Sequence, residues 1–242
     1  MSEPQIDARR SAAALSQSAF RLVLGSQSPR RRQLLTQDGY HFAILPAKKE
    51  VEEEVARLDA ALSPDEYARE LSIAKARDVA RQLCGKVSQG RWQVAPYFKP
   101  SLSGAPYLVL ACDSIAVCDG AILGKPEDRA DAERMLRTLS GSRHEVITGM
   151  ALQRVEIVDY ESGPNDARLE TRVEVSELLM DELEEEQLRY YLDSELWKGK
   201  AGAFGYQDGN DWLKLVSGSE SNVVGLPLEA LALEITKRFH KS

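Results

Sequence analysis

The chain of 242 residues has little cysteine, no long apolar run and no excess of positive charge. Its three cysteines, Cys84, Cys112 and Cys118, are odd in number and lack the pairing of a metal site, which argues against a disulfide framework or a zinc ribbon and fits a reducing cytoplasm. No stretch approaches the ~20 apolar residues of a membrane span. The formal charge of −7 argues against sequence-independent nucleic-acid binding, which needs a basic face. We therefore expect a cytoplasmic protein with neither a membrane nor nucleic acid as its partner.

Several common functional motifs are also missing. The sequence contains neither the GxxxxGK[ST] phosphate loop nor the GxGxxG dinucleotide fingerprint. Residues 1–20 lack the apolar centre of a signal peptide, so we expect a flexible N-terminal extension ahead of one domain at 21–242. No metal-ligand spacing links the three histidines, which we interpret as structural or surface residues: His41, His144 and His240.

Strand-like and helix-like patterns alternate along the chain, which is typical of one compact α/β unit. Apolar runs predict strands at residues 21–24, 40–46, 107–111, 145–160, 168–178 and 212–216. Start signals and apolar periodicity predict helices from Ser28, from Ser63 for about five turns, at 127–139, near 181–191 and around 228–235. The remaining segments are expected to be a loop or frayed turn at 50–54 and a surface insertion or lid at 84–106.

The stretch LGSQSPRRRQLL, residues 24–35, places three arginines in the first turn of a helix. Ser28 and the proline after it are typical of an N-cap and a first helical position. The N-terminus of a helix carries partial positive charge, so arginines there are unfavourable unless an anion binds among them. Hydroxyl groups of Ser26 and Ser28 add donors for such an anion. The alternative interpretation is that the arginines form surface salt bridges with the acidic segment 50–54.

Three further charged residues accompany this anion-binding pattern. Lys75 falls in the apolar stripe of its predicted helix, where it either extends its ammonium group to solvent or serves a site. Asp113 follows an apolar strand, and we predict that it lies where that strand ends. Lys125, in a GKP sequence after a predicted Asp119-Gly120 hairpin turn, adds a second cation for phosphate. A carboxylate beside cations suits phosphoryl chemistry, because Mg²⁺ prefers oxygen ligands and water needs orientation.

These motifs occur in one order along the chain, from about residue 21 to 239. They are SxSPRR, the pair Lys75-Ala76, Asp113, GKP followed by a helix and LSG, HEVITG, AGAFGYQ and SNVVGLPL. Together they resemble Maf-like proteins, nucleoside triphosphate pyrophosphatases that are also linked to septum formation. The resemblance implies an inosine triphosphate pyrophosphatase-like fold, in which a mixed twisted sheet with flanking helices forms two lobes around a cleft.

The resemblance also implies roles for particular residues. Family members hydrolyse the α–β phosphoanhydride of a nucleotide with a divalent metal cation, Mg²⁺ or Mn²⁺. Asp113 matches the catalytic carboxylate, which is also a possible metal ligand, and Glu50 is the nearest match to a second metal contact, with Glu52 or Glu53 as substitutes. Gln207 matches the glutamine of the loop GIQG in members that act on dTTP and UTP, although this chain reads GYQDG. The expected phosphate-binding residues are Ser26, Arg30, Arg31, Lys75 and Lys125.

Two alternatives remain beside a dTTP or UTP pyrophosphatase. Family members that act on 7-methyl-GTP usually carry a tryptophan within SPWRR and lack the glutamine, whereas this chain has Arg30 and Gln207. A nucleotide-binding regulator of cell division without turnover is the second alternative. Retention of Asp113 argues against it, because binding alone favours removing a carboxylate from beside phosphates. The resemblance also implies a homodimer.

Overall fold

The computed structural model describes residues 12–15, 20–57, 62–88, 106–155 and 169–239, without the side chains of 84–88 and of 238–239. Its strands are β1 (Arg21–Leu24), β2 (Phe42–Ile44), β3 (Tyr107–Cys118), β4 (Ala121–Leu123), β5 (Arg143–Val155), β6 (Leu169–Met180) and β7 (Leu213–Ser217). Its helices are α2 (Pro29–Gln37), α3 (Glu50–Ala56), α4 (Pro64–Ser88), α5 (Arg129–Leu139), α6 (Glu185–Asp193), α7 (Glu220–Val224) and α8 (Leu228–Phe239), with two 3₁₀ turns, η3 (Ala201–Ala203) and η4 (Tyr206–Asp208).

The described strands form one mixed sheet of seven strands, in the order β2-β1-β3-β5-β6-β7 with β4 beside β3. β1 is parallel to both of its neighbours, whereas β3, β5, β6 and β7 are joined by antiparallel pairing. The β3–β4 hairpin turns at Asp119 and Gly120, whose φ angles of 49° and 78° suit a tight two-residue turn. The mixed sheet and this hairpin confirm the sequence prediction.

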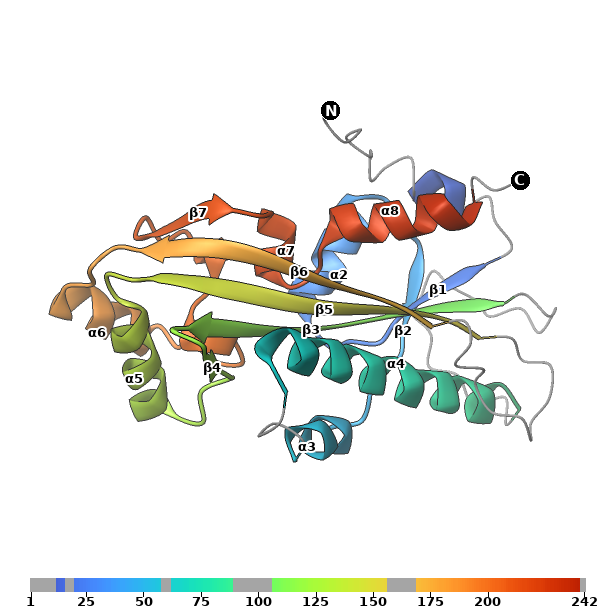
Figure 1. The fold of residues 1–242 in the computed structure, drawn as a ribbon, viewed down its shortest axis with the longest axis horizontal. Helices are drawn as coiled ribbons and strands as arrows, with labels where there is room; N and C mark the ends of the chain where they lie inside the picture. The colour runs from blue at the N-terminus through green and yellow to red at the C-terminus, as the bar shows by residue number, and fades with distance from the viewer. Residues whose placement is uncertain (1–11, 16–19, 58–61, 89–105, 156–168, 240–242) are drawn as a thin grey trace.

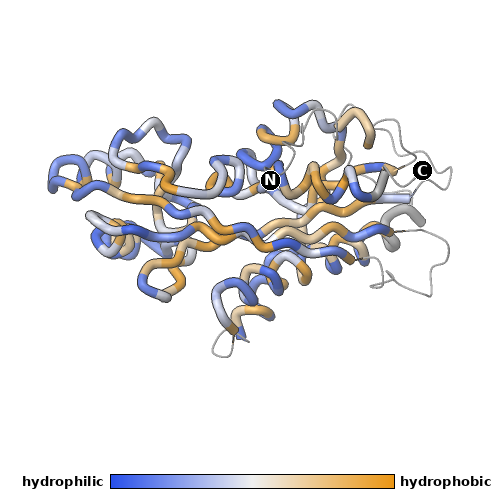
Figure 2. The backbone as a smooth tube through the Cα atoms, turned by 45° about the horizontal axis from the view of Figure 1, so that its top comes forward, coloured by the Kyte–Doolittle hydropathy of each residue, from blue (hydrophilic) through white to orange (hydrophobic). Residues whose placement is uncertain are grey.

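Helices cover both faces of the sheet, as predicted (Figure 1). On one face, Val79 of α4 packs against Val109 of β3. On the other face, Leu231 of α8 packs against Leu108 and Leu110. Successive residues of β3 therefore serve opposite hydrophobic layers, as the alternation of side chains along a strand requires. Figure 2 shows hydrophobic residues concentrated along the central strands.

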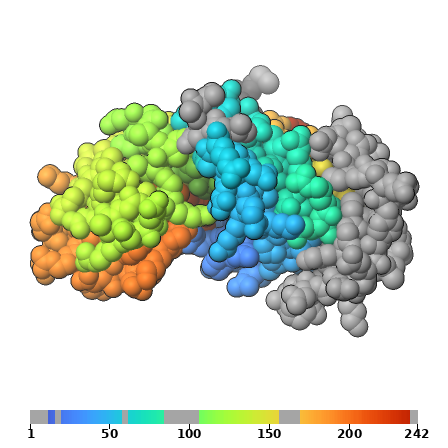
Figure 3. All heavy atoms as spheres, turned by 90° about the horizontal axis from the view of Figure 1, so that it is seen from below, coloured from blue at the N-terminus to red at the C-terminus, as the bar shows by residue number. Residues whose placement is uncertain are grey.

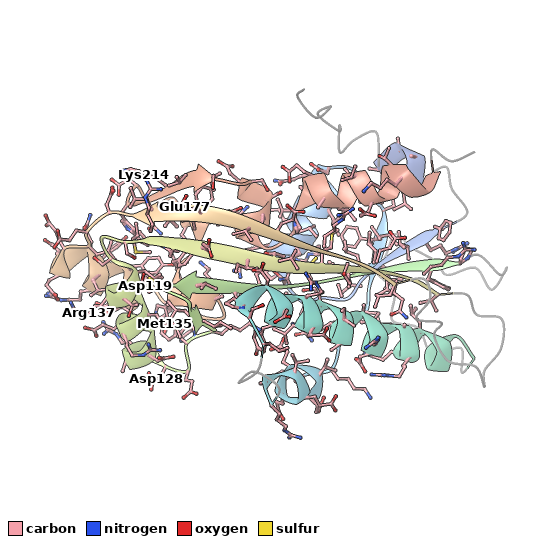
Figure 4. All side chains as sticks on the ribbon, viewed as in Figure 1. Asp119, Asp128, Met135, Arg137, Glu177 and Lys214 are labelled. Carbon is pink, nitrogen blue, oxygen red and sulfur yellow. The ribbon has the colours of Figure 1, made fainter. Side chains whose placement is uncertain are left out.

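A third hydrophobic cluster fills the other end of the molecule, where α5 and α6 pack beside β4 and the ends of β5 and β6. Its buried members include Leu136 of α5, Leu188 of α6 and Trp212. Figure 4 shows Met135 and Arg137 of α5 and the hairpin residue Asp119 together at this end. This cluster is the core of one lobe, and the clusters under α4 and α8 are the core of the other lobe. Figure 3 shows the two lobes side by side, with α3 at their junction.

Four segment predictions need correction. The predicted strand at 107–111 continues to Cys118 without a break. The helix from Ser63 has the predicted capping box but runs to Ser88, well past five turns, so the predicted insertion at 84–106 starts too early. The segment 50–54 is part of helix α3, because Val51 and Val55 bury one face of it. Residues 12–15 are helical, and Ala12 and Leu15 are buried in the cluster under α8, so this part of the extension is packed.

Two expected features lie outside the described residues. The turn predicted at 163–165, between β5 and β6, falls in one of the gaps, as does the insertion from residue 89 to residue 105. Within the described ranges, every helix is too short or too polar to cross a membrane.

Candidate active site

The site begins at a gap along one edge of β3. β5 pairs with β3 along its length, from Tyr107 to Val117. On the opposite edge, pairing with β1 ends at Leu110, and pairing with β4 starts at Ala116. No described strand therefore occupies that edge between these two positions. A cavity of about 680 Å³ opens at the gap and is lined by residues of both lobes.

Asp113 lies in the middle of this gap and points to the α4 side of the sheet. Its carboxylate oxygen Oδ1 is 2.5 Å from Nζ of Lys75, and Nζ of Lys75 is also 2.7 Å from Oε1 of Glu52. Glu52 in turn lies 3.3 Å from Nζ of Lys125. Two carboxylates and two ammonium groups thus alternate along one wall of the cavity. The prediction that Asp113 lies at a strand end was wrong, because it is the neighbour β1 that ends there.

Lys75 is a buried residue that serves the site. Its side chain is only 8% exposed and forms two ion pairs, so it does not extend to solvent. α4 reaches this position because β5 has glycine opposite Asp113. A Cβ on Gly149 would overlap the backbone carbonyl of Ala68, so any side chain there would push α4 away from the sheet. Gly149 therefore lets the helix approach closely enough for Lys75 to reach Asp113.

Electrostatics at Glu52 reflect the same arrangement. Burial by itself would raise the pKa of Glu52, but the ammonium groups of Lys75 and Lys125 outweigh it, and the pKa lies below its ordinary value. Glu52 is therefore ionised at neutral pH. Glu52 and Asp113 are thus two carboxyl groups that share the ammonium group of Lys75.

The three arginines of α2 have three different environments. Arg30 faces the cavity, Arg31 is buried beneath it, and Arg32 is exposed and does not line it. Ser28 caps the helix by accepting a hydrogen bond from the backbone of Arg31, as predicted. Within the described part of the chain, none of the three forms an ion pair with residues 50–54, so the surface salt-bridge interpretation is wrong.

Arg31 braces the floor of the site. Its Nε donates to the carbonyl of Gly225 at 2.6 Å, and its two terminal nitrogens donate to the hydroxyls of Ser26 at 3.1 Å and Ser114 at 3.2 Å. Ser114 is also 2.8 Å from the hydroxyl of Thr148 on β5. The guanidinium thereby joins the loop after β1, the gap in β3 and the end of α7. Most of its hydrogen-bonding capacity goes to the protein itself.

Among the described residues, none forms such a brace with the side chain of Arg30. Burial and the charge of Arg31 lower its pKa, and Asp208 and Tyr191 oppose them only in part. Across the cavity, Nζ of Lys200 hydrogen-bonds both carboxylate oxygens of Asp208, and the hydroxyl of Tyr191 donates to Oδ2 of the same carboxylate at 2.6 Å. Arg30 is therefore a half-buried cation that faces the cavity with its donors available.

The cavity as a whole is positively charged in a negatively charged protein. Eight Lys and Arg side chains line it against four Asp and Glu side chains, an excess of four positive charges. The full chain has a formal charge of −7. A nucleoside triphosphate carries about four negative charges near neutral pH. The charge of the cavity thus suits a polyphosphate ligand.

The structure brings nearly all of the predicted site residues to this one cavity. Its lining includes Ser26, Arg30, Arg31, Lys75, Asp113, Lys125 and Gln207. Glu50 is the exception, because it is exposed and does not line the cavity, so its assignment as a metal contact needs correction. Residues two apart on a helix point in nearly opposite directions, and it is Glu52 that faces the site. Glu52 was the substitute that the resemblance allowed.

Sequence reasoning missed Lys200 and Asp208. Both lie in WKGKAGAFGYQDG, where the only signal was two lysines just before a glycine-rich loop and an aspartate just after Gln207. The loop brings them together because glycine at position 205 leaves space for the Lys200–Asp208 pair. Pairing between residues eight apart in irregular structure has no periodic pattern in a sequence.

Oxygen ligands for a divalent metal converge beside Lys75. Within the described ranges, no cluster of three or more His, Cys, Asp or Glu side chains has the arrangement of a closed metal centre. Mg²⁺ is commonly held by one or two carboxylates together with substrate phosphates and water. Asp113 and Glu52, which approach one nitrogen atom within 2.5 and 2.7 Å, fit such an open site. The donor set therefore suits Mg²⁺ or Mn²⁺.

Comparison with known proteins identifies the family. The family model described as Maf-like protein matches residues 21–238. This chain belongs to the Maf-like family. The Maf-like match begins at the first residue of β1 and includes every element that lines the cavity.

Individual proteins are similar to this chain over most of its length. A dTTP/UTP pyrophosphatase of Rhodopirellula baltica is 42% identical over 91% of this chain and 83% of its own length. A dTTP/UTP pyrophosphatase of Ruminiclostridium cellulolyticum is 36% identical over 89% of this chain and 95% of its own length. Among solved structures, a HAM1 protein from Coxiella burnetii matches 90% of this chain and 99% of its own, at 16% identity and a TM-score of 0.41.

Proposed function

We propose that this chain is a metal-dependent pyrophosphatase that hydrolyses dTTP and UTP to the monophosphate and pyrophosphate. The observation that carries the proposal is the pair of carboxylates, Asp113 and Glu52, beside Lys75 in a cavity with four excess positive charges. The relatives named dTTP/UTP pyrophosphatase support it. In the reaction, the oxygen of water bonds to the α-phosphorus, and the bond from that phosphorus to the α–β bridging oxygen breaks. The bridging oxygen leaves with pyrophosphate.

The residues of the cavity have separate roles in this reaction. Arg30 and Lys125 face the cavity from opposite lobes and hold the phosphate chain between them by charge-assisted hydrogen bonds. Arg31 keeps the loop of Ser26 in place beneath the phosphates. Asp113 accepts the proton that water loses as it attacks. A carboxylate that positions and deprotonates water commonly contributes about 10² to 10⁴ to the rate.

Asp113 and Glu52 are the residues that would hold the divalent metal. When bound, the metal neutralises charge on the phosphate oxygens and so favours attack at phosphorus. Lys75, which bridges the two carboxylates, keeps them near each other. Glu52→Gln should weaken Mn²⁺ binding by about tenfold, because a charged ligand is lost. Glu50→Gln is the matched control, and it should leave Mn²⁺ binding unchanged.

The proposed substrate preference depends on Gln207, which lines the cavity from η4. A side-chain amide offers one acceptor and one donor group, which together complement the adjacent N3–H and O4 of thymine or uracil. The amide can therefore recognise the base while the cations hold the triphosphate.

The test is release of pyrophosphate from a panel of canonical and modified nucleoside triphosphates, with Mg²⁺ or Mn²⁺. We expect release from dTTP and UTP to exceed release from the other nucleotides. Release from 7-methyl-GTP alone would assign the protein to the other branch of the family. Binding of nucleotides without any release would instead support a regulator without turnover.

The organisation of the chain yields three further predictions. We propose one domain at 21–242, with an insertion that begins after Ser88, in a cytoplasmic protein that forms a homodimer. Analytical ultracentrifugation of the full chain tests the dimer. A sedimentation coefficient of a monomer at micromolar concentration would contradict it.

A further inference from the structure

Selection of a pyrimidine by Gln207 needs a fixed orientation of its amide. Thymine and uracil present an N–H donor beside a carbonyl acceptor, whereas cytosine presents an acceptor beside an amino donor. An amide that turns over exchanges its donor and acceptor and therefore complements either base. The side chain of Gln207 is exposed, and within the described residues it forms no hydrogen bond of its own. The position of the amide therefore depends on the loop that holds it.

Asp208, the next residue, anchors that loop. Its side chain is 11% exposed and accepts hydrogen bonds from Lys200 and from the hydroxyl of Tyr191. Lys200, which is 9% exposed, precedes η3, and Tyr191 lies on α6. The ring of Tyr191 is itself held edge-on against Trp212, with centroids 5.4 Å apart. The carboxylate of Asp208 thus ties η4 to the hydrophobic core of one lobe.

The backbone of the loop is closed tightly around this pair. A Cβ on Gly205 would overlap both the carboxylate of Asp208 and Nζ of Lys200, so the chain passes directly over them. Gly209 follows with a φ of 78° and ends the turn. Gln207 therefore stands on a short segment that is fixed on both sides.

Asp208 places a carboxylate in the cavity that we propose binds a triphosphate. An unpaired carboxylate there would repel the phosphates. Lys200 neutralises the charge of Asp208. Burial lowers the pKa of Arg30, and the nearby charge of Asp208 opposes that decrease. The pair thus holds the loop without adding net charge to the cavity.

We infer that the Tyr191–Asp208–Lys200 network positions Gln207 so that the enzyme selects thymine or uracil over cytosine. The inference rests on the proposed function. Asp208 and Tyr191 act through Gln207 and are positioning residues, because neither needs to touch the reacting phosphorus.

The test compares wild type with Tyr191→Phe and Asp208→Asn. Tyr191→Phe removes a single hydroxyl and keeps the packed ring, and Asp208→Asn keeps an acceptor while removing the charge. The ratio of kcat/KM for dTTP to that for dCTP measures base selection. The inhibition constant of inorganic tripolyphosphate, which has no base, measures phosphate binding separately. Tyr190→Phe is the matched control, since Tyr190 is 79% exposed.

We expect each network variant to lower the dTTP to dCTP ratio by about tenfold, the effect of one hydrogen bond that involves a charged group. Inhibition by tripolyphosphate should stay unchanged in Tyr191→Phe and should strengthen in Asp208→Asn, because that variant no longer neutralises Lys200. The ratio for Tyr190→Phe should stay unchanged. The double variant should lose less than the two single variants together, because they disrupt one network.

Three results would overturn the inference. The first is an unchanged ratio in both network variants. The second is an equal loss of kcat/KM for both nucleotides with weaker tripolyphosphate inhibition, which indicates general damage to the site. In these two cases the proposed function still stands if wild type prefers dTTP. The third is a wild-type enzyme without base preference, and then the inference and the proposed substrate fail together.

Discussion

Lys75→Met should destabilise the fold by about 3 kcal/mol, the lower end for breaking a buried ion pair. The substitution keeps most of the volume of the side chain but removes the ammonium group between two carboxylates. Most of this cost arises at Asp113, because its side chain is only 13% exposed and loses a partner at 2.5 Å. The cost at Glu52 is smaller, since Glu52 is 45% exposed and keeps Lys125 at 3.3 Å. This difference places the expected cost at the lower end.

Urea unfolding at pH 7, followed by circular dichroism, measures this cost. Lys214→Met is the control, because Lys214, which pairs with Asp181, is exposed on β7 (Figure 4) and does not line the cavity. The control should cost less than about 0.5 kcal/mol. Asp113→Asn added to Lys75→Met should recover part of the loss, because the buried charge is then removed as well. A cost for Lys75→Met as small as that of the control would refute the reasoning.

Four other substitutions test separate features of the structure. Gly149→Ala should destabilise the protein by about 1–3 kcal/mol by overlap with Ala68, and a thermal melt that matches wild type would contradict the close approach of α4. Arg30→Ala should raise the KM for dTTP by about tenfold or more and leave the free energy of unfolding unchanged. Arg31→Lys should instead lower the free energy of unfolding by about 2 kcal/mol, because lysine cannot replace three separate hydrogen bonds. Burial lowers the pKa of His144 from 6.5 to about 4, so its neutral form stabilises the fold above pH 6.5, and this contribution falls as the pH drops toward 4, by about 1.4 kcal/mol for each pH unit. His144→Leu should therefore show a shallower loss of stability over that range in urea unfolding at several pH values, and an equal slope would show that His144 is not buried in its neutral form.

Much of the fold could be predicted from local patterns. The capping residue Ser28, the capping box at Ser63 and the turn at Asp119 are short signals that act within a few residues of chain. Such signals survive folding because tertiary contacts seldom oppose them. The extent of an element is harder to predict. α4 continues through residues 84–88, although CGKVS lacks a clear apolar period.

The position of Asp113 shows what a local pattern does not contain. Its exposure to the cavity depends on where β1 stops beside β3, and β1 lies more than 80 residues earlier in the chain. An aspartate after an apolar run fits two structural settings. It can lie where its own strand ends, or in the middle of a strand whose neighbouring strand ends beside it. The sequence pattern singles out Asp113, whereas its place in the middle of β3 depends on the sheet.

Glu52 and Asp208 illustrate two other limits. The choice between Glu50 and Glu52 depends on the rotation of α3, which Val51 and Val55 fix by packing. A loop at 50–54 would have no such rotation, so the sequence pattern alone does not choose between the two glutamates. Asp208 matters only because Lys200 and Tyr191 reach it from two other elements. Neither the rotation of α3 nor these contacts of Asp208 produce a periodic pattern in the sequence.

Turnover of bound dTTP by Asp113→Asn tests the central claim most directly. Calorimetry should show that the variant binds dTTP at least as tightly as wild type, since the cations that hold the phosphates remain and the charge of one carboxylate beside them is gone. A single-turnover measurement in the presence of Mg²⁺ should then show pyrophosphate release slowed by at least about a hundredfold, the usual contribution of a general base. Release at the wild-type rate from a variant that binds dTTP normally would contradict the assignment of Asp113 and the mechanism built on it.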